Sequence, residues 1–432
     1  MRARVPAAAL AGAVAVLALT TAPAALAVSP APTASSDSSG SSGSAGSSGS
    51  SGSGVSAGSG ASLGPAESLG TASAAARLNI GGPRLADRGV VVNYPAAGGP
   101  KLPAVPASAY VIADANTGQV LAAKDPHGEF APASTLKVLT AITMLPRLNP
   151  NAMVTVSKLA ASQEPNIAGL IAGHQYQVSA LFKALLLISA NDAAVALTEA
   201  TGSFATGMQL INAEAQHLQA YDVVAKMPNG LPAPGQVVSA YDEALIARQA
   251  VDSPAFMGYD STLAAPFQIK PGKSETLVNQ NTLLTQYKGG IGGKIGWTQA
   301  SGATYIGMAR RNGVTLIVTV LHCTALQEIT SGEKLLNWGF AEDGHVAPVG
   351  RLVSPLPTAA ALHQAALARA RAAARLKAAQ LSSQAVARSG TKNAGLAIGG
   401  GIAVAAAIGL TTLARARRRA ARTMFPDRHT GP

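Results

Sequence analysis

The feature that most limits how this chain can fold is a low-complexity segment close to its start. Residues from about 33 to 64 are nearly all Ser, Gly and Ala. Such residues bury little apolar surface, and ordering them costs much conformational entropy. Pro and Gly remain frequent as far as residue 103. We therefore expect a disordered tail over 28–104 and a folded domain over 105–350, which is long enough to bury a core.

The first residues resemble an export signal. Arg2 and Arg4 precede an apolar run over 7–19, and Ala25-Leu26-Ala27 follows. This order of charged, apolar and small residues is typical of a secretory signal peptide, so we predict one over 1–27, cleaved after Ala27. The alternative is an uncleaved anchor, which the short apolar run disfavours.

The C-terminal segment has the features of a membrane tether. Its Ala-rich, basic part predicts an exposed spacer helix over 355–392. Residues 395–414 carry no charge and are about long enough to span a bilayer, and five arginines follow directly. We predict a transmembrane helix over 395–414 and a basic cytoplasmic tail over 415–432, with the folded domain outside the cell. The alternative is a buried Ala/Gly helix with a basic tail.

The distribution of charge argues against nucleic-acid binding. The net charge is +12, but residues 351–432 hold 13 basic residues and one acidic residue, whereas 101–350 hold 15 and 17. A nucleic-acid-binding domain needs its basic surface on the folded part, and this domain is slightly acidic. No nucleic-acid partner is expected.

Cysteine and histidine give no sign of a disulfide, a metal site or a cofactor. Cys323 is the only cysteine of the chain, which excludes an intramolecular disulfide and any multi-cysteine metal site. The seven histidines follow no known ligand spacing. We expect His322, beside Cys323 at the end of an apolar run, to be a core or edge residue.

Hydrophobic patterns predict strands at both ends of the domain and helices between them. Two β-favouring runs flank a turn at Asn116-Thr117-Gly118, and two more flank Arg310 to Gly313, so each pair predicts a hairpin. The expected strands are 108–113, 119–123, 303–309 and 314–321, and the expected helices are 134–145, 178–188 and one starting just after 191. This order indicates an α/β (α+β) domain.

A serine paired with a lysine is the first chemical motif. Ser-x-x-Lys occurs at Ser134, Ser331 and Ser389, so the motif alone is weak. Ser134 differs because it opens a predicted helix behind Pro132. Lys137 then lies on the same helix face, and the helix N-terminus favours developing negative charge. Serine needs a base within hydrogen-bond reach to act as a nucleophile, and Lys137 is the candidate.

Two further motifs follow in order along the chain. Ser189-Ala190-Asn191 is the only Ser-x-Asn sequence, and it lies where one helix ends; its alternative role is a plain helix cap. Lys-x-Gly occurs at Lys270, Lys288 and Lys294. Only Lys294 lies between a Gly pair and a predicted strand, where it can hold a substrate carboxylate while Gly296 allows close approach to the backbone.

Taken in order, these three motifs resemble those of penicillin-binding proteins and serine β-lactamases. One branch, the D-alanyl-D-alanine carboxypeptidases, is similar over roughly 105–345. The segments that carry this resemblance are Pro132-Ala133-Ser134, Ser189 to Ala194, Pro228-Asn229-Gly230-Leu231 with Pro234-Gly235, Asn279 to Leu284, and Gly293 to Thr298. The resemblance implies a penicillin-binding transpeptidase-like fold, with an antiparallel sheet flanked by a helical subdomain.

The resemblance also implies roles in cutting peptidoglycan stem peptides. Ser134 would attack the carbonyl between the two terminal D-alanines, and Lys137 would accept its proton. Ser189 and Asn191 would relay protons and hold the substrate amide. The terminal carboxylate would bind Lys294 and Thr298, beside Gly296, and the backbone N–H groups of Ser134 and Trp297 would form the oxyanion hole. β-Lactams would acylate Ser134 as inhibitors.

Two rival functions stay open. A class A β-lactamase needs a deacylating Glu after the Ser-x-Asn motif, but residues 215–240 contain none, and Glu164 precedes Ser189. A cell-wall-binding protein with an impaired site is the other rival. Its support is Ile295, since the family usually carries Thr or Ser at this position to help bind the carboxylate.

Overall fold

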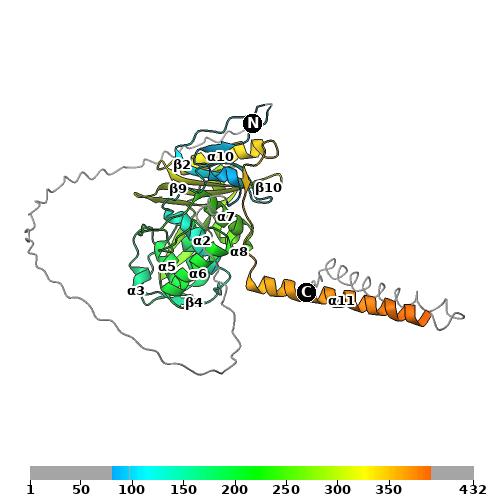
Figure 1. Ribbon diagram of the computed structural model, residues 1–432. Helices are drawn as coiled ribbons and strands as arrows, with labels where there is room; N and C mark the ends of the chain where they lie inside the picture. Colours follow the sequence, from blue (N-terminus) through cyan, green and yellow to red (C-terminus); the bar gives the residue numbers. More distant parts are fainter. Residues whose placement is uncertain (1–79, 97, 391–432) are drawn as a thin grey trace, which may run out of the picture. The chain divides into compact units, whose positions relative to one another are not determined.

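The centre of the folded domain is an antiparallel sheet that joins the two ends of the domain. The computed structural model describes residues 80–96 and 98–390 of the chain (Figure 1). The strand order is β1-β3-β2-β10-β9-β8, with β11 also pairing with β3. The strands of this sheet are β1 (Val90–Val92), β2 (Ala107–Asp114), β3 (Gln119–Lys124), β8 (Gly290–Thr298), β9 (Gly302–Arg311), β10 (Val314–Cys323) and β11 (Gly350–Arg351).

Both predicted hairpins are confirmed. Strands β2 and β3 pair antiparallel, and the Asp114 side chain holds their turn by accepting hydrogen bonds from Asn116 N at 2.8 Å and Thr117 Oγ1 at 2.6 Å. Strands β9 and β10 also pair antiparallel. Their turn places Asn312 at φ 50° and Gly313 at φ 85°, the two positive angles that a tight Asn-Gly hairpin requires.

Helices cover both faces of the sheet. Helix α10 (Glu328–Glu342) packs on one face, where Leu335, Leu336 and Trp338 join a core cluster with Tyr305 and Val318. A larger cluster lies on the other face, to which helices α2 and α7 contribute (Figure 1). The inner strands β2, β9 and β10 are therefore buried on both sides.

A group of helices and short strands lies between β3 and β8 in the sequence. The helix predicted over 134–145 forms as a 3₁₀ turn, η2, followed by α2, and the helices predicted at 178–188 and after 191 are α4 and α5. The elements are η2 (Ala133–Thr135), α2 (Leu136–Met144), β4 (Met153–Thr155), α3 (Lys158–Ala161), β5 (Gln175–Gln177), α4 (Val178–Leu187), α5 (Asn191–Glu199), α6 (Phe204–His217), α7 (Ala240–Val251), α8 (Pro254–Asp260), β6 (Ala264–Lys270), β7 (Lys273–Val278) and α9 (Leu283–Gln286). Strands β4 and β5 form one small sheet, and β6 and β7 another.

The folded domain starts earlier than expected. The 3₁₀ turn η1 (Pro83–Ala86) buries Leu85 completely, and β1 pairs with β3 with Val91 opposite Ala123. The boundary at residue 105 is therefore wrong for residues 80–104. The Pro and Gly residues that suggested an irregular tail separate short elements, whose few apolar side chains pack against the sheet.

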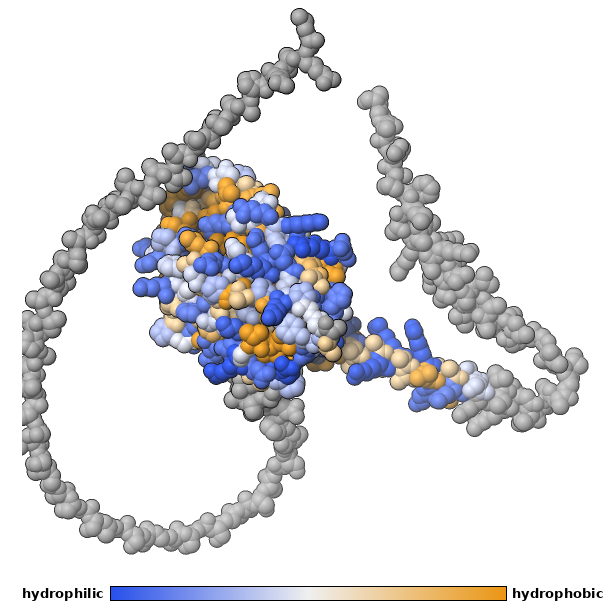
Figure 2. Space-filling model, turned by 90° about the horizontal axis from the view of Figure 1, so that it is seen from above, coloured by the Kyte–Doolittle hydropathy of each residue, from blue (hydrophilic) through white to orange (hydrophobic). Residues whose placement is uncertain are grey.

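The segment after the domain is partly described. Helix α11 (Ala359–Gly390) occupies most of the predicted spacer, and its side chains are exposed over 361–383. Hydrophilic and apolar side chains alternate along it (Figure 2). Within residues 80–96 and 98–390, no helix is long and apolar enough to cross a membrane. The predicted signal peptide, transmembrane helix and basic tail, and most of the predicted N-terminal tail, lie outside the described residues.

Candidate active site

Ser134 is held in the 3₁₀ turn that opens α2. The preceding residue, Ala133, has the uncommon positive φ of 48°. This turn is locked from two sides: a Cβ atom on Gly230 would lie 1.7 Å from Ala133 O, and Thr304 Oγ1 donates to Pro132 O at 2.8 Å. Only a glycine at position 230 leaves room for the turn, whose strained backbone the surrounding chain maintains.

Lys137 contacts the Ser134 hydroxyl. Its side chain is fully buried one turn along α2, with Nζ 2.8 Å from Ser134 Oγ. The same nitrogen donates to Asn191 Oδ1 at 2.7 Å and to Asn229 O at 2.8 Å. Ser134 and Lys137 therefore lie on the same face of the helix, as predicted, and their side chains form a direct hydrogen bond.

The environment of Lys137 favours the neutral amine. Burial lowers the pKa of Lys137 well below its usual value, and the positive charge of Lys294 lowers it further, although Asp192 opposes the shift. An amine of lowered pKa is a better proton acceptor near neutral pH than an ordinary lysine.

The Ser-x-Asn motif lies in the turn between α4 and α5. Asn191 is the first residue of α5; its Oδ1 faces Lys137, while its Nδ2 donates to Glu164 O at 2.9 Å. Ser189 has a φ of 62° and is buried, and its hydroxyl forms no hydrogen bond within the described part of the chain. The motif is therefore more than a helix cap, because it delivers an amide oxygen to the buried lysine.

Lys294 lies on β8, the edge strand of the central sheet, which was not among the predicted strands. It is buried, and its Nζ donates to Ile295 O at 2.7 Å. Burial lowers the pKa of Lys294 to about 7, and the Asp260 carboxylate limits this fall. The ammonium form therefore predominates only below about neutral pH.

The same strand passes very close to the nucleophile. A Cβ atom on Gly296 would lie 2.7 Å from Ser134 N. The next residue, Trp297, is 61% exposed. Thr298 Oγ1 lies 2.7 Å from Ser301 Oγ. No hydrogen bond joins Trp297 or Thr298 to Ser134 among the described residues, so their predicted roles rest on their place along β8.

Ile295 packs away from Lys294 and Gly296. Side chains alternate between the faces of an extended strand, and β8 pairs regularly with β9 from Gly292 to Thr298. Ile295 is half-buried against the cluster under α10. Its aliphatic side chain therefore has a packing role on the other face of the sheet.

Sequence reasoning missed two buried carboxylates beside the motifs. Asp260, at the end of α8, accepts a hydrogen bond from Gly293 N at 2.6 Å; burial raises its pKa to about 7, although this bond and Lys294 oppose the shift. Glu243 accepts a hydrogen bond from Thr135, and burial raises its pKa to about 8. Neither has a fixed spacing from a motif, so no sequence pattern indicated its position.

The alternative motif matches lie elsewhere. Ser331 is buried in α10, with its hydroxyl 3.6 Å from Cys323 Sγ, while Lys334 is exposed. Lys392 lies outside the described residues. Lys270 is exposed at the end of β6. Of the Ser-x-x-Lys sequences, the one at Ser134 thus joins its serine to a buried lysine, whereas the lysine that follows Ser331 is exposed.

Penicillin-binding acyl-enzymes are the class of protein that combines this sheet with a helix-opening serine bonded to a buried lysine. The family model described as D-alanyl-D-alanine carboxypeptidase, peptidase S11, matches residues 96–325, more than half of the chain. The chain belongs to this family of serine-type peptidases. The resemblance and the fold class predicted from the sequence are therefore confirmed.

Individual relatives agree with this assignment. The chain is 35% identical over 251 residues to the D-alanyl-D-alanine carboxypeptidase DacB2 of Mycobacterium tuberculosis, covering 57% of this chain and 86% of that protein. It is 31% identical over 255 residues to DacD of Escherichia coli, covering 56% of this chain and 64% of the relative. The chain thus spans less than two thirds of DacD.

Solved structures show the same fold. A crystal structure of a D-alanyl-D-alanine carboxypeptidase from M. tuberculosis aligns with a TM-score of 0.57 and 33% identity, over 62% of this chain and 100% of that chain. A mutant of the Streptomyces K15 DD-transpeptidase aligns with a TM-score of 0.53 and 28% identity, over 55% of this chain and 99% of that chain.

Proposed function

We propose that this chain is a serine-type D-Ala-D-Ala carboxypeptidase that trims the terminal D-alanine from peptidoglycan stem peptides. The observation that carries the proposal is the hydrogen bond of 2.8 Å between Lys137 Nζ and the partly buried Ser134 Oγ, beside the buried side chain of Asn191. Membership of the carboxypeptidase family supports the substrate class.

In the acylation step, Lys137 accepts the proton of the Ser134 hydroxyl. A neutral amine has two N–H groups and one lone pair. Asn191 Oδ1 and Asn229 O can only accept, so they hold the two N–H groups. The lone pair is then left for the Ser134 hydroxyl, whose oxygen attacks the carbonyl carbon between the two D-alanines.

The negative charge of the tetrahedral intermediate is stabilised by the backbone. In this proposal the N–H groups of Ser134 and Trp297 donate to the oxyanion, and the close approach of Gly296 keeps the two elements together. The ammonium of Lys294 and the hydroxyl of Thr298 hold the terminal carboxylate. Collapse of the intermediate breaks the peptide bond, and the leaving amine takes up a proton through Ser189 and Lys137.

Water completes the reaction by hydrolysing the ester on Ser134, which releases the shortened peptide and regenerates the hydroxyl. A β-lactam enters the same path, because its strained amide acylates Ser134. The leaving group stays attached in the opened ring, so hydrolysis is slow. β-Lactams are therefore proposed as acylating inhibitors.

An impaired cell-wall-binding protein is the second candidate, and Ile295 is the observation behind it. The packing of Ile295 under α10 weakens this argument. A β-lactamase has less support, because Glu164 is exposed and contacts Asn191 through its backbone oxygen.

We also propose that the chain is exported and tethered to the cell membrane, with the catalytic domain outside. The apolar run 395–414 and the arginines after it support this topology. Protease added to intact cells should release a fragment that contains Ser134 and should leave a C-terminal tag intact. Digestion of the tag would contradict this orientation.

Mass analysis of a synthetic pentapeptide ending in D-Ala-D-Ala tests the proposed activity. Incubation with the full chain should remove one alanine. Ser134→Ala should abolish the loss, and Ser331→Ala, in the matched Ser-x-x-Lys sequence, should leave it unchanged. An intact peptide after prolonged incubation with a chain that binds penicillin would favour the impaired binding protein.

A further inference from the structure

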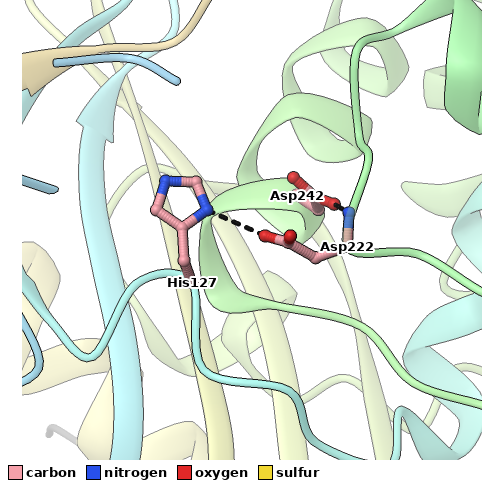
Figure 3. Close-up of side chains that lie close together, drawn as sticks. All are labelled: His127, Asp222 and Asp242. Atoms are coloured by element: carbon pink, nitrogen blue, oxygen red, sulfur yellow. Dashed lines mark hydrogen bonds and ion pairs between the residues drawn. The ribbon is translucent and has the colours of Figure 1, made fainter. Parts of the chain in front are cut away.

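One imidazole and two carboxylates from distant parts of the sequence converge away from the residues of the proposed active site. His127 lies between β3 and η2, Asp222 lies between α6 and α7, and Asp242 lies in the first turn of α7. One nitrogen or oxygen of each lies within 4.8 Å of those of the other two. Figure 3 shows the three side chains turned toward one another.

The contacts of His127 leave its second ring nitrogen facing a carboxylate. Its Nε2 lies 3.2 Å from Ile80 O, and its Nδ1 lies 2.8 Å from Asp222 Oδ2. A carbonyl oxygen only accepts, so Nε2 carries the hydrogen. In a neutral imidazole, Nδ1 then presents a lone pair to an oxygen that also only accepts. A cation, either a proton or a metal ion, has to lie at this contact.

The surroundings of Asp242 bear on whether the cation between His127 and Asp222 is a proton or a metal ion. Its side chain is completely buried, and its Oδ2 accepts from Asp222 N at 2.7 Å (Figure 3). Its Oδ1 forms no hydrogen bond, and no Lys or Arg within residues 80–96 and 98–390 forms an ion pair with either carboxylate. A proton on His127 alone would leave this oxygen unsatisfied in a buried site, which is costly. Burial and the neighbouring Asp222 raise the pKa of Asp242 well above its usual value, so a second proton, on Asp242, is the alternative to a metal ion. A metal ion contacts both groups.

The surroundings also suit metal ligands. A histidine that binds a metal usually donates its other N–H to a backbone carbonyl or a carboxylate, and ligating carboxylates accept hydrogen bonds themselves. Ile80 O and Asp222 N supply these two contacts here. The Asp222 side chain is 11% exposed, which gives an ion access from solvent.

We propose that His127 Nδ1, an oxygen of Asp222 and Asp242 Oδ1 bind a divalent transition-metal ion, with zinc as the best match. Zinc takes nitrogen and oxygen ligands at about 2.0–2.2 Å in tetrahedral geometry, so two donors on one ion lie roughly 3.4 Å apart. The contact of 2.8 Å between His127 Nδ1 and Asp222 Oδ2 is shorter than this, so the two side chains have to separate by about 0.6 Å to admit the ion. Water would complete the coordination.

The proposed ion has a structural role. It ties together the loop that leads to Ser134, the segment at Ile80 and the start of α7, which are far apart in the sequence. Its binding therefore stabilises the fold without taking part in the chemistry at Ser134.

Zinc titration of the tag-free full chain tests the site. After metal is removed with a chelator, zinc is added back and unbound zinc is removed by desalting, the parent should retain about one zinc per chain by elemental analysis. Free zinc at a hundredfold excess over Kd should raise Tm by on the order of 5–10 °C, whereas Mg²⁺ should not, because it prefers all-oxygen sites. Asp242→Asn and His127→Gln should lose both effects. His174→Gln, which changes an exposed histidine, should behave as the parent.

Either of two results overturns the proposal. A parent chain that retains no zinc and shows no zinc-dependent Tm would indicate that protons alone compensate the cluster. Retention of one zinc by Asp242→Asn would show that the ion binds elsewhere. If Asp242→Asn does not fold, the parent titration and His127→Gln decide the question.

Discussion

Gly296 on β8 faces the backbone nitrogen of Ser134 so closely that a Cβ atom would lie 2.7 Å from that nitrogen. The strand that holds Lys294 and the turn that holds the nucleophile are therefore in contact through their backbones. This contact explains why the third motif, which begins at Lys294, has a glycine at position 296.

The first prediction follows from this contact. Gly296→Ala should push β8 away from the Ser134 N–H group and disturb the proposed oxyanion hole. Loss of one such donor costs about 100- to 1,000-fold in rate, so acylation by a fluorescent penicillin should slow by about 100-fold or more. Gly258→Ala, where no atom lies within 4 Å of the added Cβ, is the matched control. An unchanged rate in Gly296→Ala would show that this approach is not needed.

The second prediction concerns the proposed base. Lys137→Met keeps the length of the buried side chain but removes the amine, so acylation should fall by about 100- to 10,000-fold. Its Tm should fall, because Asn191 Oδ1 and Asn229 O lose a buried hydrogen-bond donor. Lys334→Met alters the exposed lysine of the duplicate motif and should label at the parental rate. Rapid labelling of Lys137→Met would assign the base to another group.

The third prediction concerns the dependence of kcat/KM on pH. Lys137 has to be neutral, so activity is lost as pH falls through its lowered pKa. Lys294 has to be charged to bind the carboxylate, so activity is also lost as pH rises through its pKa of about 7. Asp260 favours the charged form of Lys294. Asp260→Asn should therefore move the alkaline limb to lower pH while retaining an acceptor for Gly293 N.

A pH profile of kcat/KM on the pentapeptide measures this shift. Asp252→Asn, which neutralises an exposed carboxylate, should leave the alkaline limb where it is. A limb that moves to higher pH in Asp260→Asn would mean that the alkaline limb does not report Lys294.

The fourth prediction concerns the departure from the family pattern. A hydroxyl at position 295 would add a hydrogen bond worth on the order of 1.5–3 kcal/mol if it reached the carboxylate, but Ile295 packs on the face of β8 away from Lys294. We therefore expect Lys294 and Thr298 to hold the carboxylate without it, so Ile295→Thr should raise kcat/KM on a D-Ala-D-Ala peptide by less than about tenfold. If the parent chain shows no turnover and Ile295→Thr restores it, the assignment of the natural protein as an enzyme is contradicted. Lower activity in the variant would indicate that Ile295 shapes the pocket for another substrate.

Local sequence patterns predicted the parts of the site that depend on local geometry. Ser134 and Lys137 are three residues apart on one helix, so their contact follows from helical spacing. The β9–β10 hairpin follows from Asn312-Gly313. The Gly pair before Lys294 and the strand predicted after it distinguished this lysine from the other two Lys-x-Gly sequences, although strand β8 itself was not predicted.

Other parts depend on long-range packing that no local pattern specifies. Asp260 reaches Gly293 from the end of α8, and Glu243 reaches Thr135 from α7. As single acidic residues at no fixed spacing they resemble surface residues, which most such side chains are. Strand β1 was missed because three valines between Pro- and Gly-rich segments become a strand only through pairing with β3.

The measurement that tests the central claim most directly is mass analysis of the chain after reaction with a penicillin. If Ser134 is the nucleophile, one covalent adduct per chain is expected on the peptide that contains Ser134, and no adduct is expected in Ser134→Ala. An adduct on another residue, or a Ser134→Ala variant that labels as strongly as the parent, would contradict it.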